Sequence, residues 1–204
     1  TTELAYFSPG KTTNPHDSSR TPGGSSSGSA AAVAAHMAPL SIGSQTNGST
    51  IRPASYCGIV GYKPSYGLIS RSGVLRQSEK LDHIGVFGKN VEDVALLAKV
   101  LIKKDIYDSS TIHYAADEML RVCKKGPLFE PKFIFYKTKN WKNVDKASQK
   151  SFEFFIKTFK KNIEVFDTPS YFDLIPKYHR IIHETDMANN FQNYYKKSKK
   201  KLSK

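Results

Sequence analysis

Two short segments contain the residues of this sequence whose types and spacing best suit chemistry. Residues 23–29 (GGSSSGS) form a glycine–serine loop ahead of an alanine-rich stretch, and residues 46–49 (TNGS) form a polar turn. Serine can attack a carbonyl carbon, but it is a weak nucleophile until a base takes its proton. On residue types alone, structural explanations therefore compete with a catalytic one.

The glycine–serine loop has three structural explanations. A flexible linker is disfavoured, because the loop runs directly into a predicted helix. A phosphate cradle is disfavoured, because the loop contains no lysine of the kind that the P-loop pattern requires. A helix cap is expected from Ser27 or Ser29. Ser49, in the second segment, could simply be a turn serine with a local hydrogen bond.

Other side chains with chemical potential are expected to be structural. Cys57 is predicted to be a small buried packing residue, and both cysteines are predicted to be reduced, as in a cytoplasmic protein. No group of His, Cys and carboxylate residues has metal-ligand spacing, so no metal or cofactor is expected. Two adjacent acid–histidine pairs are predicted to belong to turns: His16-Asp17 and Asp82-His83.

The composition is that of a packed domain with an unevenly distributed positive charge. Of 204 residues 39% are apolar, and no apolar run is long enough to span a membrane. The net charge is +13, but six lysines lie within residues 196–204. We therefore expect a solvated lysine-rich surface, and a nucleic-acid-binding module remains a weaker alternative that would show affinity falling steeply with salt.

The pattern along the chain predicts alternating strands and helices. Helices are expected over 28–38, where Pro39 would stop the run, after Asn90 and Asp145, and over 174–195. Strands are expected over 40–43, 58–62, 132–136 and 163–166, and a further apolar strand after Asp82-His83. This order predicts an α/β fold with a mixed, largely buried β-sheet covered by helices.

Three stretches resemble the amidase signature family in pattern, spacing and order. They read GGSSSGSAAAVAA, SIGSQTNGSTIRPASYCGIVGYKPSYGLISRSGV and LDHIGVFGKNVEDVALL. The resemblance is specific over about residues 1–105 and looser to the end. It implies one partial amidase signature domain over 1–204, with a more divergent segment, rich in lysine and aromatic residues, over about 121–204.

The resemblance implies hydrolysis of a carboxylic amide through an acyl-enzyme. The implied nucleophile is Ser49, and the implied bridging serine is Ser25, 24 residues earlier, next to a cis peptide bond. The implied supporting loop is formed by Gly23, Gly24 and Ser26. The implied oxyanion hole consists of backbone N–H groups, those of Thr46, Asn47, Gly48 and Ser49.

Two departures from the family pattern affect the expected activity. The family's general base is a lysine upstream of the bridging serine, and we do not assign that role to Lys11, which lies in a loop-like stretch. The lysine is therefore expected upstream of Thr1, and residues 1–204 alone are expected to be inactive. Asn47 stands where the family usually has glycine, and we expect it to adopt the left-handed conformation that glycine permits.

Within the family, the residues around Ser49 favour a stand-alone amidase with a small-molecule substrate. Residues 44–53 read SQTNGSTIRP, whereas the amidotransferase A subunit that acts on misacylated glutamyl- or aspartyl-tRNA usually has a segment like SDTGGSIRQP. That tRNA-dependent enzyme is the first alternative, and a catalytically inactive relative is another. A homodimer is left open.

Overall fold

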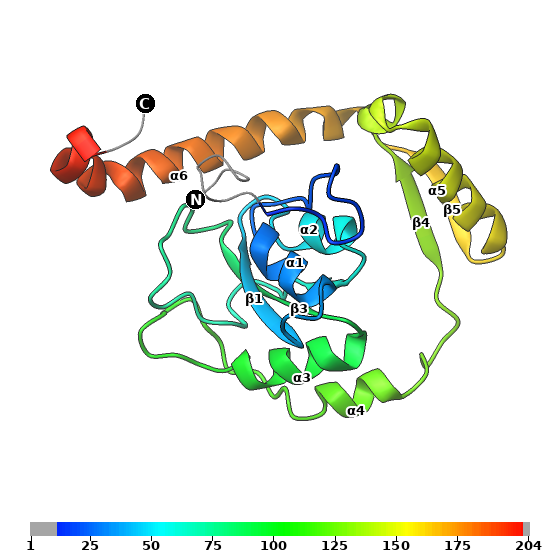
Figure 1. The fold of residues 1–204 in the computed structure, drawn as a ribbon, viewed down its shortest axis with the longest axis horizontal. Coiled ribbons are helices and arrows are strands. Elements are labelled where there is room, and N and C mark those ends of the chain that lie inside the picture. The colour runs from blue at the N-terminus through cyan, green and yellow to red at the C-terminus, as the bar shows by residue number, and fades with distance from the viewer. Residues whose placement is uncertain (1–11, 202–204) are drawn as a thin grey trace. The chain divides into compact units, whose positions relative to one another are not determined.

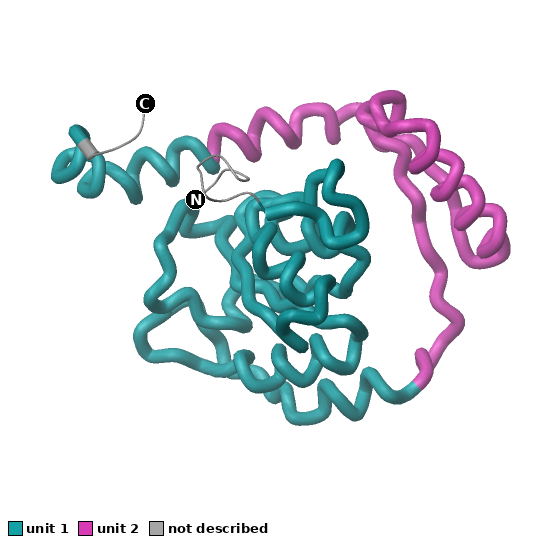
Figure 2. Tube along the Cα trace, in the orientation of Figure 1, with its two compact units in different colours: residues 1–125, 183–204 teal, residues 126–182 magenta. Residues whose placement is uncertain are grey.

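The computed structural model describes residues 12–201, which form two compact units (Figure 2). Within the described range, unit 1 comprises residues 12–125 and 183–201, and unit 2 comprises residues 126–182. No helix in the described range has the length and apolar content needed to cross a membrane.

Unit 1 is built on a three-stranded antiparallel sheet in the order β1-β3-β2. Figure 1 labels two of its strands, β1 and β3. Its strands are β1 (Leu40–Gln45), β2 (Val60–Tyr62) and β3 (His83–Gly88). Along β1 and β3 the register runs from Leu40 opposite Gly88 to Gln45 opposite His83. The end of β1 therefore lies beside the beginning of β3, and the polar turn after β1 starts at this edge.

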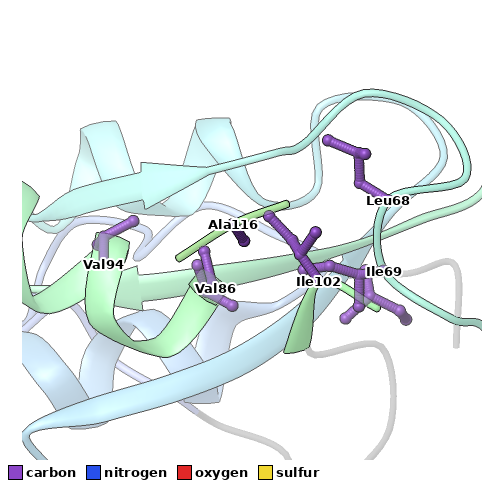
Figure 3. Packing of buried hydrophobic residues seen from close by; sticks show 8 residues of the cluster. Leu68, Ile69, Val86, Val94, Ile102 and Ala116 are labelled. Atoms are coloured by element: carbon purple, nitrogen blue, oxygen red, sulfur yellow. The ribbon is translucent and has the colours of Figure 1, made fainter. Parts of the chain in front are cut away.

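Helix α3 (Val91–Leu101) packs on one face of this sheet. Val86 of β3 and Val94 of α3 belong to the buried cluster there (Figure 3), and Ala98 of the same helix is fully buried. This cluster consists of Leu68, Ile69, Ile84, Val86, Val94, Ala98, Ile102 and Ala116. Asn90 caps the helix, as predicted, by accepting a hydrogen bond from the Asp93 N–H at 2.8 Å.

Helices α1 (Ser27–Ala34) and α2 (Ile51–Tyr56) contribute to a second cluster around Phe87 of β3. Successive strand residues point to opposite faces of a sheet. The Val86 side chain therefore belongs to the first cluster and the Phe87 side chain to the second. The second cluster consists of Ala30, Val33, Ala34, Ala54, Cys57 and Phe87. The two helices that follow the serine segments are thus fixed to the sheet by a common core.

Helix α1 ends earlier than the sequence predicted. The expectation placed its end at Ala38, just before Pro39, but the last helical residue is Ala34. His36 has φ 60° and donates its N–H to the Val33 carbonyl, while Met37 donates to the Ala32 carbonyl. This paired pattern is a Schellman motif, which satisfies the last carbonyls of the helix before the proline is reached.

Unit 2 contains two parallel strands, β4 (Phe133–Lys137) and β5 (Ile163–Asp167), joined by α5 (Lys146–Thr158). Asp145 caps α5, as predicted, by accepting from the Ser148 N–H at 3.0 Å. Phe135 of β4 packs against Phe152 of α5, with ring centroids 5.5 Å apart. Short 3₁₀ turns follow each strand: η1 (Lys139–Asn143) and η2 (Ser170–Leu174).

The remaining elements are α4 (Met119–Lys124), α6 (Ile175–Ser198) and η3 (Lys199–Lys201). Helix α6 begins in unit 2, and its residues from His183 onward belong to unit 1. The predicted mixed α/β fold is confirmed, with β3 as its buried strand. Two short helices, α2 and α4, were not predicted.

Candidate active site

The glycine–serine loop packs closely on α2 before it enters α1. A Cβ atom on Gly23 would lie 2.9 Å from the Pro53 Cα, so only glycine fits at that point. The peptide bond between Gly24 and Ser25 is cis, as the resemblance implied.

The serines of the loop bind the edge of β1 instead of capping α1. Ser26 occupies the N-cap position without a side-chain cap, and both Ser27 and Ser29 lie inside the helix, so the predicted cap is wrong. The Ser26 hydroxyl donates to the Ser44 carbonyl at 3.1 Å and accepts from the Ser44 N–H at 3.2 Å. Ser29 donates to the Ile42 carbonyl at 2.8 Å. These hydroxyls satisfy the strand's outer polar groups and fix the loop to it.

The polar turn is shaped by Gly48 and by a side chain from the end of β1. Gly48 has φ +85°, the left-handed region. Gln45 Oε1 accepts hydrogen bonds from the N–H groups of Thr50 at 2.9 Å and Ile51 at 3.1 Å, which satisfies the start of α2. The expected left-handed conformation at Asn47 is wrong, because the reversal occurs one residue later, at Gly48.

The two serine segments are joined directly. The Ser26 N–H donates to the Ser49 carbonyl, with an N–O distance of 3.3 Å. Arg52, in the first turn of α2, adds a second connection. Its Nη1 donates to the Gly24 carbonyl at 3.1 Å and its Nη2 to the Asn47 carbonyl at 2.7 Å. One planar guanidinium group therefore holds the cis loop and the turn at a fixed separation.

Ser25 and Ser49 line the same cavity, which has a volume of about 120 Å³. Eight polar residues line it: Ser25, Ser44, Thr46, Asn47, Ser49, Arg52, Gln77 and His183. The structure thus brings together two serines predicted to act together. The sequence assigned no role to Gln77 or His183, because both are distant along the chain and neither belongs to a recognisable motif.

Three residues of the turn line this cavity, and the backbone N–H groups of the turn have no protein acceptor in the described range. Within residues 12–201, none of the N–H groups of residues 46–49 donates a hydrogen bond to another protein group. The Thr46 hydroxyl, by contrast, donates to Asp82 Oδ1 at 2.6 Å. The side chain of Thr46 is therefore fixed to the protein while the N–H groups of its turn remain available to a ligand.

A buried ion pair anchors the loop that leads to Gln77. Arg71 and Asp108 have side chains 3% and 1% exposed, and Arg71 Nε lies 3.3 Å from Asp108 Oδ2. Burial raises the pKa of Asp108, but hydrogen bonds from Ser110 and Arg71 outweigh that effect, so the pKa lies well below its ordinary value. Burial lowers the pKa of Arg71, but the same carboxylate outweighs this effect and raises it.

The side chains predicted to be structural make structural contacts. Cys57 is fully buried, its Sγ lies 3.4 Å from the Pro22 carbonyl, and burial raises the pKa of its thiol, which disfavours a thiolate. His16 Nε2 contacts the Cys57 carbonyl at 2.9 Å. Asp82 Oδ2 accepts from the N–H groups of Gln77 at 2.7 Å and Ser78 at 3.0 Å. These groups fix the loops around the cavity.

The part of the chain that the structure describes supplies neither a lysine nor a metal-binding group to the cavity. No lysine is among its described lining residues. Lys11, to which we assigned no catalytic role, lies outside the described residues. No three His, Cys, Asp or Glu side chains gather as metal ligands within residues 12–201.

The chain is similar in sequence and in fold to known amidases and amidotransferase subunits. The A subunit of glutamyl-tRNA(Gln) amidotransferase from Campylobacter lari is 53% identical over 106 residues, which is 52% of this chain and 23% of that protein. The crystal structure of the corresponding Thermotoga maritima protein aligns with a TM-score of 0.71 and 32% identity, covering 89% of this chain and 40% of that one. The native peptide amidase of Stenotrophomonas maltophilia aligns with a TM-score of 0.72 and 26% identity, covering 92% and 39%.

The chain thus spans well under half the length of the proteins that it matches. The Amidase family model matches residues 1–204. The cis loop, the turn of Ser49 and this match together show that the chain belongs to the Amidase family, the family of the amidase signature.

Proposed function

We propose that the protein hydrolyses a carboxylic amide through an acyl-enzyme formed on Ser49. The observation that carries the proposal is the shared cavity of Ser25 and Ser49, whose segments are hydrogen-bonded to each other. Attack by Ser49 Oγ on the amide carbonyl would form a tetrahedral intermediate, whose collapse would release the amine. Water would then hydrolyse the ester.

The backbone N–H groups of the turn would stabilise the negative charge of this intermediate. Those of Thr46, Asn47, Gly48 and Ser49 are the proposed donors, and their lack of protein acceptors within residues 12–201 supports this role. Oxyanion donors stabilise charge that develops in the transition state, and the loss of one typically costs about 10²–10³ in rate.

Ser25 is proposed to relay the proton of Ser49 toward a general base. In the family resemblance that base is a lysine acting as a neutral amine, and a neutral lysine needs a lowered pKa. The hydrogen bonds between Ser26 and Ser49 and between Arg52 and Gly24 support a fixed position for the relay.

A second candidate function is that of the A subunit in a glutamyl-tRNA(Gln) amidotransferase. Identity of 53% to the Campylobacter lari protein supports this candidate, whereas residues 44–53 favour a stand-alone amidase. Such a protein would hydrolyse glutamine and pass on the ammonia. Glutamine hydrolysis that requires partner proteins and misacylated tRNA would distinguish it from a stand-alone amidase.

Acyl transfer to hydroxylamine tests the proposed intermediate. Full-length protein should convert a panel of amides, glutamine included, to hydroxamates when hydroxylamine is present, because this nucleophile intercepts an acyl-enzyme. Ser49→Ala should abolish both the hydroxamate and the hydrolysis. Hydrolysis that continues in this variant would contradict the proposal.

A further inference from the structure

Gln77 faces the cavity from a backbone that is fixed to the turn of Ser49. Its N–H donates to Asp82 Oδ2 at 2.7 Å, and the other oxygen of the same carboxylate accepts from the Thr46 hydroxyl at 2.6 Å. Asp82 is nearly buried, at 7% exposure. One carboxylate therefore sets the distance between Gln77 and the proposed oxyanion donors.

Helix α6 also fixes this backbone by two hydrogen bonds. Asn190 Nδ2 donates to the Gln77 carbonyl at 3.1 Å, and the buried Ser78 hydroxyl donates to Asp186 Oδ2 at 2.5 Å. Asp186 and Asn190 lie one turn apart, so they contact neighbouring residues of the loop from one side of the helix. The position of Gln77 is thus determined by two segments more than a hundred residues apart.

The side-chain amide of Gln77 carries N–H groups that can donate hydrogen bonds to a ligand. Its Oε1 lies 3.4 Å from His183 Nε2, a contact that requires a proton on that nitrogen. Among residues 12–201 the Gln77 amide nitrogen has no hydrogen-bond partner. A half-buried NH₂ group beside the two serines is therefore available to a bound molecule.

The polar lining of the cavity favours a bound molecule that carries a hydrogen-bond acceptor. The described lining contains no carboxylate and no apolar side chain, and Arg52 contributes a positive charge. An oxygen that accepts a hydrogen bond is favoured in such surroundings, whereas a hydrocarbon would leave the polar groups unpaired.

We propose that Gln77 determines specificity, donating its side-chain NH₂ to an acceptor oxygen on the substrate's acyl group. The preferred substrates are then amides whose acyl chain carries a carbonyl or carboxylate oxygen a few bonds from the scissile bond. This inference rests on the proposed reactivity of Ser49. Gln77 would bind the substrate, and Asp82, Asp186 and Asn190 would position it.

Two fluorophosphonates of equal length test the proposal, one ending in a methyl ketone and the other in an isopropyl group. The measurement is the rate constant for modification of Ser49 in full-length protein. Wild type should react about three to ten times faster with the ketone probe, the range that one neutral hydrogen bond provides. Gln77→Leu should bring the two rates within about twofold by slowing only the ketone probe.

Controls separate this inference from the reactivity of Ser49. Gln192→Leu makes the same change at an exposed position of α6 and should leave both rates unchanged. Gln77→Glu keeps the side chain's shape but replaces the donor by a carboxylate, and it should also slow the ketone probe selectively. Modification of Ser49 without a ketone preference, or a preference that survives in both Gln77 variants, would overturn the proposal. Absence of any modification of Ser49 would overturn the proposed function itself.

Discussion

The Ser26 N–H group donates a hydrogen bond to the Ser49 carbonyl, with an N–O distance of 3.3 Å. This bond connects the residue after Ser25 with the proposed nucleophile, across more than twenty residues of sequence. The arrangement of the two serines is thus set by backbone contacts, and side-chain changes nearby should affect reactivity according to how they alter those contacts.

Arg52→Lys should slow modification of Ser49 by a fluorophosphonate about 10- to 100-fold. The guanidinium binds the Gly24 and Asn47 carbonyls together, and a lysine ammonium cannot reproduce this two-pronged geometry. A shift of about 1 Å in a reacting group can cost about 10² in rate. Arg20→Lys is the matched control, because Arg20 forms an exposed pair with Asp17 and its replacement should leave the rate unchanged.

Gly48→Ala and Gly73→Ala should differ in reactivity much more than in stability. Both glycines have positive φ, +85° and +76°, so alanine should lower the free energy of unfolding by roughly 1–2 kcal/mol at either position. Only at Gly48 does the new Cβ meet a neighbour, lying 2.9 Å from Arg52 Nη2. Denaturant unfolding and labelling of Ser49 should show similar destabilisation, with slower labelling confined to Gly48→Ala. Equal labelling rates would contradict the geometry of the turn.

Asn47→Gly should leave activity close to that of wild type. The backbone of Asn47 is not left-handed, so glycine would relieve no strain there. Glycine also keeps the backbone carbonyl that accepts the hydrogen bond from Arg52. The comparison of kcat/KM between the two proteins checks this expectation. A loss of more than about tenfold would mean that the Asn47 side chain acts in the reaction.

Asp108→Asn should destabilise the protein by up to about 3–5 kcal/mol at neutral pH, because it removes the buried carboxylate beside Arg71 and leaves only the more exposed Glu79 to balance that charge. The pKa of Asp108 lies below its ordinary value of 3.8. Its stabilising effect is therefore complete above about pH 5 and is lost progressively as the pH falls toward the folded-state pKa. Unfolding followed from pH 7 to pH 2 should show this acid-dependent loss in wild type and a flatter profile in the variant. Asp17→Asn, at an exposed pair, should have a far smaller effect.

Local sequence signals predicted the parts of the fold that depend on them. Asn90 and Asp145 satisfy helix N-termini with their own side chains, so both helix starts were visible in the sequence. Helix α2 was not, because Gln45, at the end of the preceding strand, satisfies its first N–H groups. Helix α1 ends through backbone hydrogen bonds around His36. A histidine at this position is not a sequence signal for a helix end, so the end was not predicted.

The candidate site shows the same division between local and distant signals. Ser25 and Ser49 were identified through segments of recognisable pattern, and the structure places both on one cavity. Gln77 and His183 reach that cavity only through tertiary contacts, including those of Asp82 and Asn190. Side chains recruited by packing leave no periodic or spacing signal, so only the fold could reveal them.

The most direct test of the proposed roles of Ser25 and Ser49 is to locate the covalent adduct of a fluorophosphonate on full-length protein by peptide mass spectrometry. The proposed mechanism predicts one modified residue, Ser49, with labelling abolished in Ser49→Ala and slowed by at least about 10³ in Ser25→Ala, while both variants stay folded. An adduct on any other residue, or a normal labelling rate in Ser25→Ala, would contradict it.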